Sequence, residues 1–305
     1  MQRNIVERYE VTVVILTYNS IIEKVFETID SILTQEKVKL QIVISDDGSK
    51  TNNFEIIKKY FEKHNFVDYK LVNNITNKGT VYNYYSGLVN SEGEYIKSIS
   101  PGDMLCNATV LRSWLDYNIN NNLAWSFSDI LCYRMENKER HILSVKAHPN
   151  CIKIYECSSE RKRRWQYVVL KDTAVGCAML GLRSIQLRYC EEIVEKVKFA
   201  EDVIWRNMMF DGIVGGYYPS STVLYEYGTG ISTNNNSKWL KRIDDDYNAA
   251  NTLIINRENT DTFQKEMIRA LSIKIGKNKL KKLLVKGNLA YLIKLKFFPR
   301  KTKIL

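Results

Sequence analysis

The sequence predicts an α/β fold in which a mostly parallel central sheet is flanked by helices, with a helical extension at the C-terminal end. Over the first hundred residues, short runs of β-branched residues alternate with longer segments whose apolar residues recur at helical spacing. This repetition of strand and helix produces parallel strands that are joined by right-handed crossovers. From Ser237 onward the pattern is helical to the end.

The first half of the chain contains the clearest elements. EVTVVILT (10–17) and LQIVIS (40–45) are continuous apolar runs, which is typical of strands buried on both faces of a sheet. Two further strands are expected at 69–72 and 94–99. Apolar residues at helical spacing predict helices at 21–33, 52–64 and 80–90.

The second half is less regular, and its pattern predicts a mixture of strands and helices. Helices are expected at 107–119 and 199–210, and a buried segment of small residues at 173–184. Strands are expected at 123–134, at 141–147, near 212–218 and at 221–227. No linker or repeat divides the chain. We therefore expect one domain over residues 1–235, followed by a helical region over 236–305.

Composition excludes several classes of protein. No apolar run approaches the roughly 18 residues of a transmembrane helix. VTVVIL (11–16) is too short for the apolar region of a signal peptide, so we expect a cytoplasmic protein. None of the six cysteines belongs to a C-x-x-C pair, which argues against structural zinc and favours reduced thiols.

The net charge of +11 is concentrated at the C-terminal end. Residues 270–305 contain eleven Lys or Arg and no Asp or Glu, so the rest of the chain is neutral. Leucines in this segment recur roughly at helical spacing, which predicts an amphipathic helix lying on an anionic bilayer. One alternative is a helix packed on the domain with a solvated lysine face. A nucleic-acid surface is not expected, because aromatic residues do not interleave with the lysines.

Two polar loops follow the first two predicted strands. They are TYNS (17–20) and SDDGSKTNN (45–53), and both should lie at the carboxyl end of the sheet, where open parallel sheets bind ligands. Asp46 and Asp47 could accept hydrogen bonds from a ribose or a base, although D-G-S is also ordinary turn chemistry. Neither G-x-G-x-x-G nor G-x-x-x-x-G-K-[ST] occurs, so dinucleotide and P-loop sites are not indicated.

These loops belong to a longer series of motifs, which in chain order are VTVVILTYNS, IDSILTQ, LQIVISDDGS, NKGTVYNYYSGL and GEYIKSISPGD. Together they resemble the start of a family 2 glycosyltransferase with the GT-A fold, a Rossmann-like α/β architecture. The resemblance covers residues 10–105 well and extends more loosely to about residue 230. It implies a nucleotide-sugar half at about 10–105 and an acceptor half at about 106–235.

The resemblance places six residues around a nucleotide-sugar donor, for which a UDP-linked sugar is expected: Thr17, Tyr18, Asp46, Asp47, Lys78 and Asn83. Thr17 and Tyr18 would line the nucleobase. Asp47 would bind the base, and Asp46 would support its loop. Lys78 and Asn83 match positions that approach the donor, and the alternative for Asn83 is an ordinary helix residue.

AEDVIW (200–205) matches the segment in which the family carries its general base at the start of a helix. Asp202 occupies the position of the base, and Glu201 is its neighbour. A carboxylate near a helix N-terminus is expected to stay ionised, because the macrodipole favours the anion. It could then take a proton from an acceptor hydroxyl. The alternative is a pair of residues that cap the helix.

SISPGDML (98–105) lies where the family usually carries an Asp-x-Asp motif that holds Mg²⁺ or Mn²⁺ under the donor diphosphate. Ser100, Pro101 and Gly102 occupy the usual acidic positions, and Asp103 lies one position beyond them. The motif is therefore incomplete. Either Asp103 ligates a metal ion, or Lys or Arg side chains must neutralise the diphosphate.

The sequence thus predicts an inverting glycosyltransferase of bacterial surface polysaccharide synthesis, which acts on a glycan or lipid-linked glycan at the inner face of the plasma membrane. Residues 270–305 would provide the peripheral contact with the membrane. One alternative is a nucleotidyltransferase acting on sugar phosphates, although a glycine-rich loop would be expected where this chain has TYNS. The other is a degenerate, non-catalytic glycan-binding or scaffold subunit, which the incomplete SPGD segment favours.

Overall fold

The computed structural model describes residues 9–228, 237–276 and 278–302. Nine strands form one sheet with the order β3-β2-β1-β4-β8-β6-β9-β5, and β7 pairs with β6. The strands are β1 (Tyr9–Thr17), β2 (Leu40–Asp46), β3 (Tyr69–Asn73), β4 (Gly93–Ile99), β5 (Met104–Leu105), β6 (Trp125–Glu136), β7 (Glu139–Leu143), β8 (Met179–Leu182) and β9 (Gly216–Glu226). The predicted α/β fold is confirmed.

Parallel pairing is concentrated in the first half of the sheet. The strands β3, β2, β1 and β4 are neighbours and run parallel, as the strand–helix alternation predicts. The central strands are buried on both faces: Val13 and Ile15 of β1 belong to one hydrophobic core, and Val14 belongs to the other. This explains why the sequence of β1 is continuously apolar rather than alternating.

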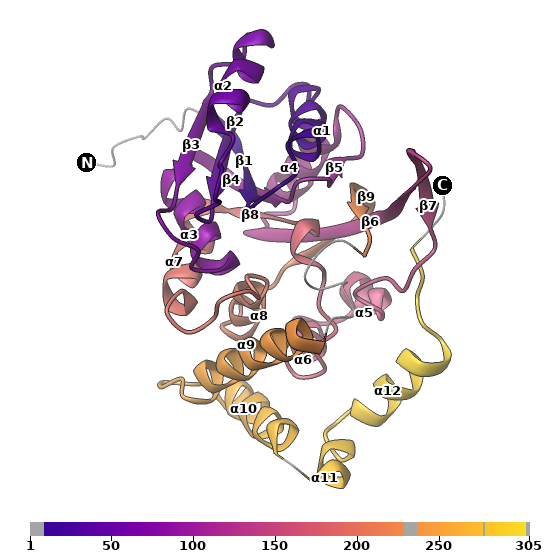
Figure 1. Ribbon diagram of the computed structural model, residues 1–305. Coiled ribbons are helices and arrows are strands. Elements are labelled where there is room, and N and C mark those ends of the chain that lie inside the picture. The colour runs from indigo at the N-terminus through magenta and orange to yellow at the C-terminus, as the bar shows by residue number, and fades with distance from the viewer. Residues whose placement is uncertain (1–8, 229–236, 277, 303–305) are drawn as a thin grey trace, which may run out of the picture.

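Twelve α-helices cover the two faces and the lower end of the sheet (Figure 1). Helices α1 (Ile22–Leu33), α2 (Phe54–Lys63) and α4 (Val110–Asn120) cover one face. Helices α3 (Thr80–Asn90), α7 (Arg183–Ile193), α8 (Val203–Phe210), α9 (Ser237–Ile255) and α10 (Thr262–Ile275) pack on the other. The remaining helices are α5 (Ile152–Cys157), α6 (Glu160–Val168), α11 (Lys279–Leu283) and α12 (Asn288–Phe297).

The second half departs from the predicted elements in three places. The strands expected near 212–218 and at 221–227 form the single strand β9, whose register against β6 shifts beside Ser128 and Asp129. The strand expected at 141–147 is shorter and ends at Leu143. The helix expected at 199–210 begins only at Val203. Helices α5, α6 and α7 were not predicted.

The C-terminal segment folds back onto the domain instead of continuing as a helix. After α12, Arg300 forms an ion pair with Asp129 of β6, and the backbone of Arg300 and Thr302 bonds to the 145–147 segment. The hydroxyl of Tyr291 in α12 donates to the buried carboxylate of Asp172, at 3.0 Å. The prediction that the chain is helical to its end is therefore wrong for residues 298–302, which run back along the loop that follows β7 (Figure 1).

Candidate functional site

The loop after β2 is shaped by the carboxylate of Asp46. This carboxylate accepts hydrogen bonds from Thr17 Oγ1 at 2.9 Å, from the Ser49 amide at 2.7 Å and from Ser49 Oγ at 2.6 Å. Gly48 adopts a φ of 71°, and a Cβ there would lie 2.6 Å from the backbone of Thr76. The loop is therefore a tight turn, closed by Asp46 and pressed against the segment that follows β3.

Asp47 links that turn to the start of α3. Its carboxylate accepts hydrogen bonds from the amides of Lys78 and Gly79, both at 2.9 Å. Burial raises the pKa of Asp47, and the two amide hydrogen bonds oppose this rise. Asp47 therefore holds the second and third loops of the carboxyl edge together, and its remaining lone pairs are what it could offer to a ligand.

Asn83 lies beneath these loops in a buried network. Its amide group donates to the Ser45 carbonyl oxygen at 2.9 Å and accepts from Ser45 Oγ at 2.7 Å. Tyr18, in contrast, is 52% exposed, and the exposed Lys78 places Nζ 4.0 Å from the centroid of the Tyr82 ring. The six residues predicted to surround the donor thus lie on the first three loops of the carboxyl edge and on α3. Four are buried, and only Tyr18 and Lys78 extend into solvent.

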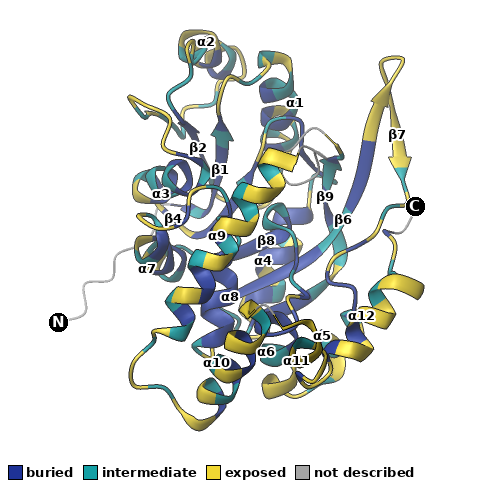
Figure 2. Ribbon diagram, turned by 60° about the horizontal axis from the view of Figure 1, so that its bottom comes forward, coloured by how far each residue is buried: buried dark blue, intermediate teal, exposed yellow. Residues whose placement is uncertain are grey.

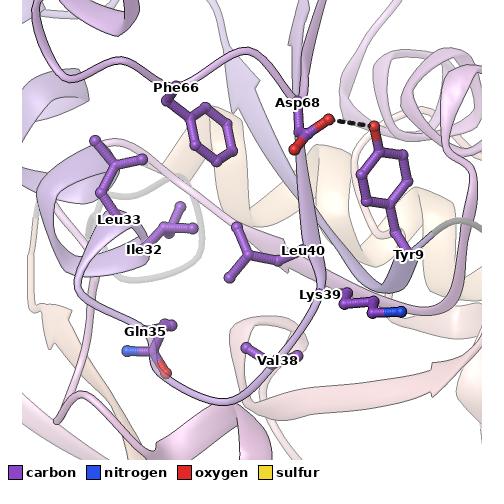
Figure 3. Close-up of a pocket in the computed structure, with 9 residues that line it drawn as sticks. All are labelled: Tyr9, Ile32, Leu33, Gln35, Val38, Lys39, Leu40, Phe66 and Asp68. Carbon is purple, nitrogen blue, oxygen red and sulfur yellow. Dashed lines mark hydrogen bonds between the residues drawn. The ribbon is translucent and has the colours of Figure 1, made fainter.

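A separate pocket of about 470 Å³ lies at the opposite edge of the sheet (Figure 3). Tyr9, Lys39 and Leu40 line it, at the amino ends of β1 and β2. Figure 3 shows the hydrogen bond from the Tyr9 hydroxyl to Asp68 beside it. Because ligands of open parallel sheets bind at the carboxyl ends of the strands, this pocket is not the candidate donor site.

Glu201 and Asp202 form the turn that precedes α8, and both side chains are half-buried. Asp202 is the N-cap residue, but its side chain makes no capping hydrogen bond. Instead, its Oδ2 accepts a hydrogen bond from the Tyr247 hydroxyl at 2.6 Å. The Glu201 carboxylate lies against Gly176, where a Cβ would be 2.9 Å from Oε1. The two carboxylates therefore contact different parts of the structure, and the capping alternative does not describe Asp202.

Burial dominates the electrostatics of this pair. It raises the pKa of Glu201 to about 8, and the charge of Asp202 adds to that rise. Burial also raises the pKa of Asp202, but the Tyr247 hydrogen bond and the positive charge of Arg206 oppose the rise. For Glu201, desolvation therefore favours the neutral carboxyl group more than the helix N-terminus favours the anion. Asp202 is the better placed of the two to carry the negative charge of a base.

Asp246 of α9 holds the backbone just before this pair. Its carboxylate accepts from the amides of Lys198, Phe199 and Ala200 at 3.1, 2.6 and 3.1 Å. The Lys198 carbonyl oxygen in turn accepts from the Val81 amide of α3 at 2.9 Å. The loop that carries Glu201 and Asp202 is therefore fixed against the donor loops. Sequence reasoning did not identify Asp246, and its only local signal is a run of three Asp residues on a helix.

The SPGD segment forms a crowded turn at the end of β4. Asp103 is 4% exposed, and its Oδ1 accepts from the Glu226 amide at 3.0 Å. Burial raises its pKa to about 7. Gly102 has a φ of 96°, and a Cβ there would lie 2.5 Å from Glu226 Oε2. The Lys24 ammonium group forms an ion pair with this Glu226 carboxylate at 2.5 Å.

This turn does not fit a divalent metal ion. Mg²⁺ and Mn²⁺ require several oxygen ligands, usually including carboxylates. Within the described parts of the chain, no group of three or more His, Cys, Asp or Glu side chains could hold a metal ion. Asp103 is turned inward, and Gly102 leaves no space for a larger side chain. Among the described residues, the acidic side chain beside this turn is Glu226, and its carboxylate is paired with Lys24.

Comparison with known proteins agrees with this geometry. The family model described as "Glycosyl transferase family 2" matches residues 12–184. No curated protein matches the sequence. Similar solved structures include residues 1–349 of TarS from S. aureus, with 14% identity, a TM-score of 0.56 and coverage of 94% of this chain and 76% of that one. TarS 1–349 has also been solved with UDP-GlcNAc (12% identity, TM-score 0.55, coverage 94% and 76%).

A second similar structure is the mannosyltransferase PcManGT from Pyrobaculum calidifontis, solved in complex with GDP-Man and Mn²⁺. It shares 14% identity with this chain, with a TM-score of 0.64 and coverage of 93% of this chain and 74% of that one. At such low identity, these likenesses show a common GT-A fold. The family match spans more than half of the chain and includes both donor loops and the SPGD turn.

Replacing Asp246 by Asn should destabilise the protein and loosen the loop that carries Asp202. Asn keeps one acceptor oxygen but turns an NH₂ group towards amides that need an acceptor, so the free energy of unfolding should fall by about 2 kcal/mol. Chemical denaturation measures this change. The matched control is Asp245→Asn, because Asp245 is exposed on the same helix and should change stability by less than about 0.5 kcal/mol. Equal effects of the two variants would contradict the role given to Asp246.

Proposed function

Because the chain belongs to glycosyl transferase family 2 and is a glycosyltransferase, we propose that it moves a sugar from a nucleoside diphosphate to an acceptor hydroxyl with inversion at the anomeric carbon. The observation that carries the proposal is the position of Asp202. Its carboxylate is oriented by Tyr247 and lies on a loop that is hydrogen-bonded to α3 beside the predicted donor loops.

The proposed reaction is a single in-line displacement. Tyr18 and Lys78 are the exposed predicted donor contacts, and Asp47 and Asp46 give their loops a fixed shape. Asp202 accepts the proton of the acceptor hydroxyl as that oxygen bonds to the anomeric carbon. The bond between this carbon and the phosphate oxygen breaks, and the nucleoside diphosphate leaves with the electron pair. Such a displacement on the opposite face inverts the configuration.

The donor is proposed to be a nucleotide sugar, with a UDP-linked sugar favoured. The support comes from two structurally similar proteins, of which TarS 1–349 was solved with UDP-GlcNAc and PcManGT with GDP-Man. Both have low identity to this chain, so they support the class of donor rather than the particular sugar. The bases differ between the two, and the side chain of Tyr18 is the exposed group that this chain offers to a base.

Negative charge develops on the leaving diphosphate, and a positive group must oppose it. The residues of the SPGD turn do not fit the metal ion that the family usually carries there. The turn instead has a lysine beside it: the Lys24 side chain passes 3.4 Å from the Cβ position of Gly102 and ends in the ion pair with Glu226. We therefore favour neutralisation by side-chain cations, with Lys24 as the first candidate, over a metal held by Asp103.

The acceptor is proposed to be a lipid-linked glycan of a bacterial surface polysaccharide, presented at the inner face of the plasma membrane. In the part of the chain that the structure describes, no helix is both long enough and apolar enough to span a bilayer. Helices α11 and α12 expose large apolar side chains among lysines, however. Leu280 and Leu284 are 75% and 84% exposed, and Phe297 and Phe298 are also largely exposed.

These helices combine the two arrangements that the sequence left open. Tyr291 of α12 and Val285, in the turn between α11 and α12, are buried against the domain. The other face is apolar and basic at once, and Figure 2 shows α11 and α12 largely exposed at the periphery of the molecule. This is the arrangement that favours an anionic bilayer, because apolar groups insert and lysines meet the headgroups. A peripheral attachment of this kind would bring Asp202 near a membrane-bound acceptor.

The test of the proposed activity is a screen of UDP- and GDP-sugars for thermal stabilisation, followed by an assay of nucleoside diphosphate release with the donors that bind. Wild-type protein should transfer the sugar, and Asp202→Asn should lower kcat by a factor of about 100 to 10,000, because the base is lost. Asp245→Asn is the control and should retain the wild-type rate. Unchanged transfer by Asp202→Asn would remove Asp202 as the base. Absence of transfer by the wild type with every donor would favour a non-catalytic subunit.

The same assay tests the role of metal. In excess chelator, the wild-type protein should retain its rate of nucleoside diphosphate release, because the charge on the leaving group is met by side chains. Lys24→Met should lower kcat at least about tenfold, whereas the exposed lysine variant Lys63→Met should not. Loss of activity in chelator, with recovery on addition of Mg²⁺ or Mn²⁺, would restore Asp103 as a metal ligand.

Membrane attachment can be measured by sedimentation with vesicles that contain anionic lipid. Leu280→Glu/Leu284→Glu should weaken binding at least about tenfold, because two inserted side chains are replaced by charges that anionic headgroups repel. Val67→Glu is the control, since Val67 is exposed on the domain far from α11 in sequence. Point variants are preferred to truncation, because Tyr291 and Arg300 hold the segment to the core. Equal binding of both variants would contradict the proposed membrane surface.

A further inference from the structure

Two basic side chains, from α8 and α10, contact the segment 168–171, where α6 ends, and the segment itself carries a third basic residue, Lys171. Arg206 of α8 donates from Nε to the Val168 carbonyl oxygen at 3.1 Å. Lys274 of α10 donates from Nζ to the Val169 carbonyl oxygen at 2.8 Å. Lys171 follows in the left-handed region, with a φ of 58°. Cations at the carboxyl end of a helix satisfy its free carbonyl groups, and this accounts for one hydrogen bond each from Arg206 and Lys274.

Those contacts leave buried donors without partners. Arg206 is 1% exposed, and its Nη2 donates to the Asn251 side chain of α9, but its Nη1 has no hydrogen-bond partner among the described residues. The hydroxyl of Tyr167, which is completely buried, also has none among them. An unpaired buried polar group costs about 1–3 kcal/mol, and more when it is charged. A structural role as a helix cap therefore does not explain all of the polar atoms gathered here.

Charge is also unbalanced at this place. Burial lowers the pKa of Lys274 to about 8, and the positive charges of Lys171, of Arg206 and of Lys282 in α11 lower it further. Burial likewise lowers the pKa of Arg206 to about 10, and Tyr247 and the negative charge of Asp202 oppose this shift. Asp244 is the acidic group whose charge acts on Lys171. Like charges that destabilise one another are stabilised by a bound anion.

The cluster lies beside the candidate base, on the side away from the SPGD turn. Tyr247 contacts both: its hydroxyl donates to Asp202, and its ring centroid lies 5.3 Å from Lys171 Nζ. The Glu201 carboxylate lies against Gly176. Cys177, which follows Gly176 in the chain, accepts a hydrogen bond from Lys97 of β4 at its carbonyl oxygen. The cluster is therefore linked to Asp202 through Tyr247, whereas Glu201 and Gly176 lie beside the contact that Lys97 of β4 makes with Cys177.

We infer that Lys171, Arg206, Lys274 and Lys282 form an anion site that binds a phosphate or diphosphate group of the acceptor and so positions its hydroxyl at Asp202. Arg206 supplies the buried N–H donor, and Lys171, which is exposed, is the entrance to the site. The inference rests on the proposed function for the identity of the acceptor. The existence of the anion site does not depend on it, because binding can be measured without any sugar transfer.

The test uses inorganic pyrophosphate and isothermal titration calorimetry on the full chain. Wild-type protein should bind pyrophosphate, and Lys171→Gln/Lys282→Gln should bind it at least about tenfold more weakly, since two charge-assisted contacts are lost. The matched control is Lys279→Gln/Lys281→Gln, which removes the same charge from exposed lysines of the same region and should bind like the wild type. Lys282→Gln alone provides a milder variant if the double variant has a lowered melting temperature.

A second titration separates the acceptor site from the donor site. Saturating UDP or GDP should leave the affinity for pyrophosphate unchanged, because the donor diphosphate lies on the other side of Asp202. Competition by a nucleotide would overturn the assignment to the acceptor. Equal binding by the Lys171→Gln/Lys282→Gln variant and its control, or no binding at millimolar pyrophosphate, would overturn the site itself. If pyrophosphate binds as expected while Asp202→Asn still transfers sugar, the proposed mechanism fails and the anion site stands.

Discussion

The candidate site depends on one buried carboxylate, that of Asp246. It gathers three consecutive backbone amides, and this fixes the loop from which Glu201 and Asp202 extend. The same α9 helix carries Tyr247, whose hydroxyl orients Asp202. A helix that lies far along the chain from the donor loops thus fixes both the backbone before Asp202 and the direction of its side chain. The helix α8 starts only after Asp202, downstream of the three amides that Asp246 holds.

The acidic groups of the site differ in their hydrogen bonds and in how burial changes their pKa values. The carboxylates of Asp46 and Asp47 accept hydrogen bonds that give the loops after β2 and β3 their shape. The carboxylate of Asp103 accepts a hydrogen bond from the Glu226 amide that closes the turn after β4. Glu201 and Asp202 are adjacent, yet only Asp202 has a hydroxyl and a guanidinium that favour its anion. A pair of carboxylates whose environments move their pKa values by different amounts can divide the roles of proton acceptor and neutral neighbour. The sequence alone shows two adjacent acids; the asymmetry arises from α8 and α9.

The first 105 residues could be predicted well because their pattern is local. Continuous apolar runs, helical spacing and short polar loops determine β1 to β4 and α1 to α3, and the order of the motifs located the predicted donor residues. The rest depends on contacts between distant residues. Asp246 acts on amides 46–48 positions away, and no local pattern marks it. Two strands were expected at 212–218 and 221–227, whereas they form the single strand β9, whose register against β6 shifts between them.

The basic residues near the C-terminal end also could not be assigned to their partners from the sequence. The eleven basic residues of 270–305 account for the whole net charge, which favoured treating them as one surface. In the structure they have different partners: Lys274 reaches a carbonyl oxygen at the end of α6, Arg300 pairs with Asp129, and lysines of α11 and α12 stay in solvent among exposed leucines. The excess is therefore divided between an inward cluster beside Asp202 and an outward face. Under the proposed function, the outer face would raise the local concentration of a membrane-bound acceptor, and the inner cluster would orient its anionic group at Asp202.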